Sequence, residues 1–150
     1  MQDDLIRKIA DLMAEQSAAY TSLQSLTTHL IAALTRSEPT AIESLSRTGE
    51  TEMFRMRARL LEITSALTDF GKFRADQSEP QPLDKAAREA FETEANKLLE
   101  AARGYQKVAG RAASLALGGS SFAAASIQMC GVPPSTYRAP VLKYGRGATV

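Results

Sequence analysis

The sequence predicts an all-α protein, an antiparallel bundle of three long helices with coiled-coil-like packing, followed by a short C-terminal helix and a tail. Two observations lead to this fold class: the placement of the prolines and the spacing of the apolar residues. All six prolines fall in three places, at Pro39, at Pro80 and Pro82, and in the group Pro133, Pro134 and Pro140. A proline inside a helix costs ~3 kcal/mol, so we expect long helices in the proline-free stretches 2–36, 40–73 and 83–117, with the third helix over about 82–117. Their similar lengths suit an antiparallel bundle.

The first two stretches carry apolar residues at alternating spacings of three and four, the period of a helix with one buried face. In the first stretch these positions are Leu5, Ile9, Leu12, Gln16, Ala19, Leu23, Leu26, Leu30 and Ala33. In the second they are Ile42, Leu45, Gly49, Met53, Met56, Leu60, Ile63, Leu67 and Phe70. The segment Thr40-Ala41-Ile42-Glu43 has the form of a capping box, which predicts the start of the second helix.

The third stretch has a stripe of smaller residues and follows Asp84, a plausible N-cap. Its positions are Phe91, Ala95, Leu98, Ala102, Tyr105, Ala109, Ala112 and Ala116. Alanine buries little area, so this stripe predicts a shallow groove. Either a neighbouring helix of the same chain approaches closely there, or the groove receives an apolar helix from a partner.

The composition changes after residue 111. No charged side chain occurs from Ala112 to Tyr137, and Gly118-Gly119-Ser120-Ser121 is expected to interrupt the third helix. A short helix over 122–129 is expected beyond that break, followed by a tail with three positive charges. The uncharged run holds too many Gly, Ser, Ala, Gln and Pro residues for a membrane span. The sequence therefore predicts a three-helix bundle over 1–117 and a separate uncharged segment and flexible basic tail over 118–150.

Several function classes are disfavoured by composition. Eighteen basic and seventeen acidic residues give a net charge of +1, which argues against a nucleic-acid binder. One cysteine and one histidine are too few for a disulfide framework or for most zinc sites. His29 lacks the basic neighbour of a phosphotransfer site, and Cys130 lies in a neutral stretch that would leave its thiol inert. The acidic N-terminus shows no secretory signal. We expect a cytoplasmic protein that is not an enzyme and uses no metal or cofactor.

Several short segments resemble the FlgN family of flagellar export chaperones. The resemblance begins in 19–26, 30–34 and 41–45, which look like the first helical hairpin of that family. It continues in Arg57-Ala58-Arg59-Leu60-Leu61-Glu62-Ile63 and in Glu94-Ala95-Asn96-Lys97-Leu98-Leu99. The tail from Thr136-Tyr137 to Tyr144-Gly145 is similar to the small-residue, Tyr-containing end of the family. This resemblance implies a cytoplasmic chaperone that binds the helical C-terminal segments of hook-associated proteins and delivers them to the export gate.

Reasoning from the residues places partner binding in the uncharged stretch. Interface hot spots favour large apolar and aromatic side chains, and the stretch contains Leu115, Leu117, Phe122, Ile127, Met129, Val132 and Tyr137. These side chains would cover the apolar faces of a client's terminal helices by helix-in-groove packing. The alternative is a structural or adaptor bundle that self-associates, for example as a homodimer, through the same C-terminal segment. A fold-back of this segment onto the bundle also remains open.

Overall fold

The computed structural model describes the backbone of residues 1–129 and the side chains of residues 1–119. It contains three helices, α1 (Gln2–Arg36), α2 (Pro39–Ala75) and α3 (Lys85–Met129). Residues 1–129 contain no strand. The prediction of an all-α fold with three long helices is confirmed, and the bounds of α1 match the expected range 2–36. The chain divides into two compact units, Met1–Ala112 and Ala113–Val150.

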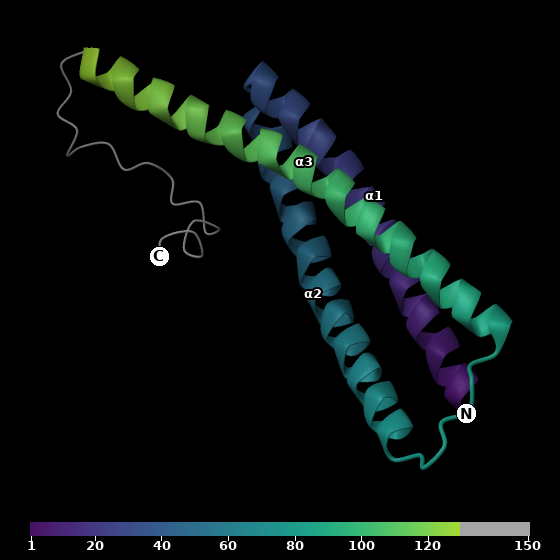
Figure 1. The fold of residues 1–150 in the computed structure, drawn as a ribbon. Coiled ribbons are helices and arrows are strands. Elements are labelled where there is room, and N and C mark those ends of the chain that lie inside the picture. The colour runs from purple at the N-terminus through teal and green to yellow at the C-terminus, as the bar shows by residue number, and fades with distance from the viewer. Residues whose placement is uncertain (130–150) are drawn as a thin grey trace. The chain divides into compact units, whose positions relative to one another are not determined.

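The first unit contains α1, α2 and the beginning of α3. The two tyrosine rings of Tyr20 on α1 and Tyr105 on α3 lie with their centroids 5.8 Å apart. Near the start of both helices, the backbone N–H of Asp84 donates to the carboxylate of Asp3 at 3.2 Å. These two contacts show that α3 runs in the same direction as α1, while α2 runs in the opposite direction (Figure 1). The unit therefore has the up-down-up order expected of an antiparallel bundle with short connections.

The core of this unit is centred on α1, because this helix contacts both of the others. Its predicted apolar stripe is buried at Ile9, Leu12 and Leu23, but the buried face is wider and adds Ile6, Ala10 and Met13. Ile63 and Ala66 on α2 and Ala87 on α3 form one core cluster with this face. Met56 on α2 and Ala112 on α3 are also buried. A helix with neighbours on two sides buries more of its circumference than a single stripe predicts.

The capping box predicted for the second helix is not formed. Ser37 takes the left-handed conformation with φ 55° and ends α1, and the N–H of Glu38 donates to the carbonyl of Ala33 at 3.0 Å. The next helix then begins at Pro39, one residue before Thr40, with Glu38 at the N-cap position and no side-chain cap. Proline suits the first helical position, since its fixed φ is helical and it has no N–H to leave unsatisfied.

The expected break at Gly118-Gly119-Ser120-Ser121 is absent. Helix α3 continues through these residues to Met129, so the predicted short C-terminal helix over 122–129 is the end of α3 itself. Each glycine disfavours a helix by only ~1 kcal/mol, and alanine, the best helix former, is frequent on both sides of the four residues. The division into compact units falls inside the same helix, after Ala112.

Candidate functional site

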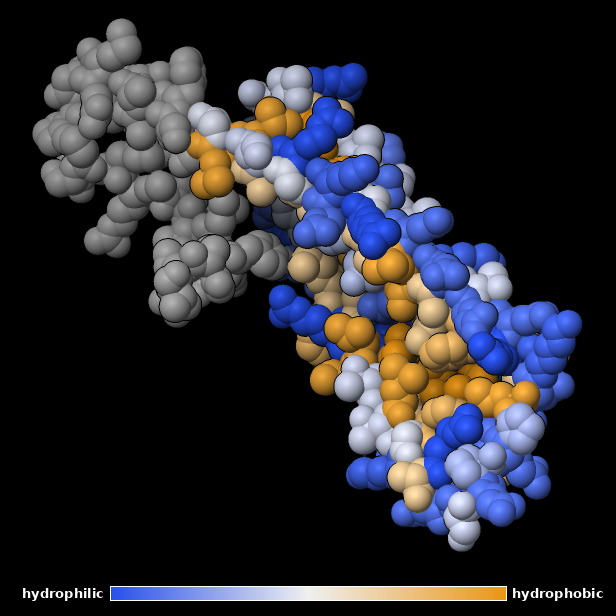
Figure 2. Space-filling model, in the orientation of Figure 1, coloured by the Kyte–Doolittle hydropathy of each residue, from blue (hydrophilic) through white to orange (hydrophobic). Residues whose placement is uncertain are grey.

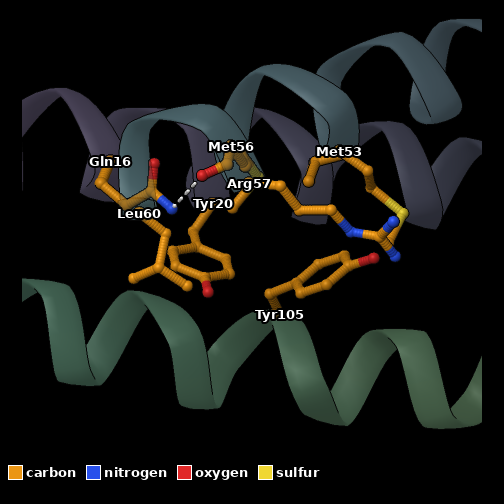
Figure 3. Close-up of a pocket in the computed structure, with 8 residues that line it drawn as sticks. Gln16, Tyr20, Met53, Met56, Arg57, Leu60 and Tyr105 are labelled. Atoms are coloured by element: carbon orange, nitrogen blue, oxygen red, sulfur yellow. Dashed lines mark hydrogen bonds between the residues drawn. The ribbon is translucent and has the colours of Figure 1, made fainter. Parts of the chain in front are cut away.

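An apolar groove runs between α2 and α3, with α1 as its floor. It contains a cavity of about 130 Å³ in the first unit (Figure 3). The residues that line it come from all three helices and are Gln16, Tyr20, Leu23, Met53, Met56, Arg57, Leu60 and Tyr105. Figure 2 shows apolar side chains gathered in the hollow of this face, with hydrophilic residues around them. Such a concave apolar surface with a polar rim is typical of a site for a protein segment.

The apolar residues of the α2 wall belong to the stripe that the sequence assigned to the core. Leu60 belongs to the predicted inward stripe but is 50% exposed, and Leu67, two turns later, is also exposed. Their neighbour Ile63 is buried against α1. The prediction that Leu60 is a core residue is therefore wrong. The physical reason is that the predicted stripe of α3 carries mainly alanines, which are too short to cover this side chain.

The floor of the groove contains one buried polar group. Gln16, the exception in the apolar stripe of α1, is 1% exposed, and its amide donates to the carbonyl oxygen of Met56 at 3.2 Å. The guanidinium of Arg59 donates to the Gln16 amide oxygen at 3.1 Å and forms an ion pair with Glu15 at 3.3 Å. Because buried amides are stable only when both ends are hydrogen-bonded, this network fixes the register of α1 against α2.

One cation lies at the edge of this apolar surface. Arg57 projects from α2, and Figure 3 shows its side chain extending toward Tyr105 on α3. Its neighbours are engaged elsewhere, since Arg55 pairs with Glu52 at 2.8 Å and Arg59 pairs with Glu15. Among the ion pairs of residues 1–119, none involves Arg57. The groove thus offers an apolar surface with a positive charge at one side.

The residues predicted to bind a partner lie in the other unit. Leu115 and Leu117 are exposed on α3, which agrees with a role in contact but does not test it. Phe122, Ile127 and Met129 belong to the last part of α3, where only the backbone is described. Val132 and Tyr137 lie outside the described residues. The binding role of these seven residues stays a prediction.

The groove itself was not predicted as a site from the sequence. Met53 and Met56 are predicted from the sequence as core residues, which is confirmed for the buried Met56, while Met53 is only partly buried. Tyr20 had no predicted role as a binding residue. The one signal that pointed toward it was the alanine-rich stripe of the third helix, which predicted a shallow groove. That stripe could not show which neighbouring helix would be left uncovered.

The other candidate residues form no centre of reactivity in the described part of the chain. His29 is exposed on α1, with its Nδ1 2.9 Å from the carbonyl oxygen of Ser25. Cys130 lies outside the described residues. Within the described residues, no group of three or more His, Cys, Asp or Glu side chains is placed to hold a metal ion. None of the helices there has an apolar stretch sufficient to cross a bilayer.

Comparison with known proteins identifies no relative. No family model matches the chain, and neither a curated protein nor a solved structure is similar to it.

Proposed function

We propose that this protein is a non-enzymatic chaperone that binds an amphipathic helix of its client in the groove between α2 and α3. The observation that carries the proposal is the apolar surface at the cavity, where Leu60 is half exposed and Met53, Tyr20 and Tyr105 are partly exposed. A helix that normally buries its apolar face in an assembly exposes that face as a monomer, and a groove of this kind can shield it.

The shape and composition of the groove suit a helix. Two helices that flank a third leave a channel into which one more helix can insert its apolar side chains as knobs into holes. Met53 supplies an unbranched, adaptable contact, which helps a surface to accept side chains of different shapes. Tyr20 and Tyr105 add large aromatic area, and tyrosine is frequent among the residues that dominate binding energy.

The charge at the groove restricts the chemistry of the client. Arg57 has no anionic partner in the described part of the chain and lies beside apolar residues. A client helix that carries an aspartate or glutamate next to its apolar stripe would pair with this guanidinium in a partly desolvated setting. We therefore infer an amphipathic helix with an acidic edge as the ligand.

The resemblance to the FlgN family suggests the identity of such a client. Under this proposal the bound helix is a C-terminal segment of a hook-associated flagellar protein, which the chaperone keeps from premature association and brings to the export gate in the cytoplasm. The sequence segments quoted above and the helical bundle support this finer proposal.

The test uses a fluorescent peptide from the C-terminal helix of a hook-associated protein encoded in the same genome, titrated with the full chain. We expect Leu60→Glu, which places a charge in the groove, to weaken binding at least about tenfold. Leu61→Glu is the matched control, because Leu61 is the next residue and is 72% exposed outside the groove. Arg57→Glu should also weaken binding, whereas Lys107→Glu on the exposed side of α3 should not.

Circular dichroism of each variant checks that the helices remain. Equal affinities for Leu60→Glu and Leu61→Glu would show that the groove is not the binding site. An absence of binding by the unmodified chain would contradict the flagellar client. A designed amphipathic helix with an acidic edge would then test the groove independently of that client.

A further inference from the structure

Two large apolar side chains project from the side of α2 that faces away from the groove. Phe54 is 76% exposed and Leu61 is 72% exposed. They are seven residues apart, so they lie on the same face of the helix two turns from each other. Neither residue lines the groove. A pair of this kind on one face is more than the scattered exposure of single apolar residues.

Phe54 and Leu61 belong to a second stripe along the whole of α2, which we call the outer α2 stripe. Its positions alternate in spacing between four and three, as in the seam of a coiled coil. All of its members are exposed, and they are Arg47, Thr51, Phe54, Ala58, Leu61, Ser65, Thr68 and Lys72. The small residues next to Phe54 and Leu61 in the stripe would allow another helix to approach closely. Arg47 and Lys72 lie at the two ends of the stripe, and their positive charges would disfavour pairing with another positively charged helix beyond them.

The charges beside the stripe indicate which helix fits. In a parallel, in-register coiled coil, the residues directly beside the seam form pairs between the two helices. The residue just before one seam position faces the residue five positions later in the sequence of the other helix. In α2 this rule pairs Glu50 with Arg55 of the second copy and Arg57 with Glu62 of the second copy. Both pairs have opposite charges, and two-fold symmetry produces each of them twice.

The same flanks are less complementary in the antiparallel orientation. In that orientation Ala58 packs against Leu61 of the second copy. Glu50 then faces Gly71 of the second copy, and Arg57 faces Thr64 of the second copy. The one remaining pair of opposite charges on these flanks is Arg55 with Glu62. In the free chain Arg55 contacts Glu52 on its own helix at 2.8 Å. Exposed pairs of this kind contribute little, so that contact can be exchanged for one across the interface.

We propose that two copies of this chain associate through the outer α2 stripe as a parallel, in-register dimer. Phe54 packs against Phe54 of the second copy, Leu61 against Leu61, and Ala58 lets the two helices approach between them. The four ion pairs at the flanks select this orientation and register. Because only three of the stripe residues are apolar, the dimer is weak and its population depends on concentration.

Sedimentation equilibrium of the full chain over a concentration series tests the proposal. The mass should rise from that of one chain to that of two.

Glu50→Arg places an arginine opposite Arg55 in each of the two symmetry-related Glu50–Arg55 pairs. We expect the dissociation constant of the dimer to increase about tenfold. Adding Arg55→Glu to the same chain should restore dimerisation. Glu100→Arg, an equal charge reversal on exposed α3, should have no effect. A chain that stays monomeric at all concentrations, or one whose dimer is insensitive to these variants, overturns the proposal.

A cysteine at Ser65 tests the orientation in the Cys130→Ser background. In the parallel pair the two Ser65 residues face each other, so Ser65→Cys should form a disulfide-linked dimer on mild oxidation. In the antiparallel pair Ser65 faces Phe54 of the second copy, which separates the two cysteines by about 16 Å along the helices, beyond disulfide reach. Ser22→Cys, exposed on α1, is the control that should not cross-link. Cross-linking no faster than this control would contradict the parallel pair.

The dimer and the groove share Arg57, which lines the groove and flanks the outer α2 stripe, but Leu60 and Leu61 separate the two sites. Leu61→Glu should abolish dimerisation while it leaves binding of the client peptide intact, and Leu60→Glu should do the reverse.

Discussion

Ile9 and Leu60 occupy similar places in the apolar stripes of α1 and α2, but their surroundings differ. Ile9 is completely buried, whereas Leu60 is half exposed at the groove. Ile9→Ala should lower the free energy of unfolding by about 2–5 kcal/mol, because it leaves a cavity in the core. Leu60→Ala should cost only about 1 kcal/mol, since half of its side chain is already in water.

Urea denaturation midpoints measure this difference. A loss of several kcal/mol for Leu60→Ala would mean that the groove is closed in solution, and it would remove the basis for a binding site there.

At the scale of the element, the glycines within the helices are the clearest local weakness. A β-carbon at Gly71 of α2 would meet no atom within 4 Å, and one at Gly49 would lie 3.4 Å from a methyl carbon of Leu26, an ordinary contact. Gly71→Ala and Gly49→Ala should therefore each stabilise the protein by about 1 kcal/mol through the higher helix propensity of alanine.

Gly104 of α3 provides the contrast. A β-carbon there would lie 2.9 Å from the amide oxygen of Gln24, so that side chain must move before alanine can be accommodated. The gain from Gly104→Ala should be smaller than that from Gly71→Ala. Thermal unfolding followed by circular dichroism orders the three variants, and a loss of stability in Gly71→Ala would show that α2 is not a regular helix at this point.

At the scale of the whole molecule, the core lies entirely within the first compact unit. Every buried residue of the described side chains lies at or before Ala112. Removal of residues 119–150 should therefore leave the helicity of the first unit and its urea midpoint nearly unchanged. Under the groove proposal, the truncated protein should also keep its affinity for the client peptide.

This deletion distinguishes the groove from the site predicted in the uncharged stretch. Loss of peptide binding by a stable truncated protein would assign the contact to Phe122, Ile127 and the residues that follow. Loss of stability would instead show that this segment completes the bundle, as the fold-back alternative states.

The sequence alone determined the helices of this protein, because the signals for a helix are local. Pro39 and the pair Pro80 and Pro82 separate the helices, and the spacing of three and four residues between them is resolved within a few turns. The same locality explains the errors. Gly118 and Gly119 are weak helix-breaking signals, because alanine-rich segments lie on both sides of them, and α3 continues through them. The second helix begins at Pro39, one residue before the predicted cap at Thr40.

Only the tertiary structure decided which parts of each stripe are covered. The period of α2 assigns Leu60 and Ile63 to the same face, yet Ile63 is buried against α1 while Leu60 lies open at the groove. Likewise, Gln16 appears in the sequence as an interruption of an apolar stripe, and only its contacts with Met56 and Arg59 explain its burial. The physical reason is that burial depends on the distance to a neighbouring helix and on the size of its side chains, and neither can be derived from the periodicity of one helix.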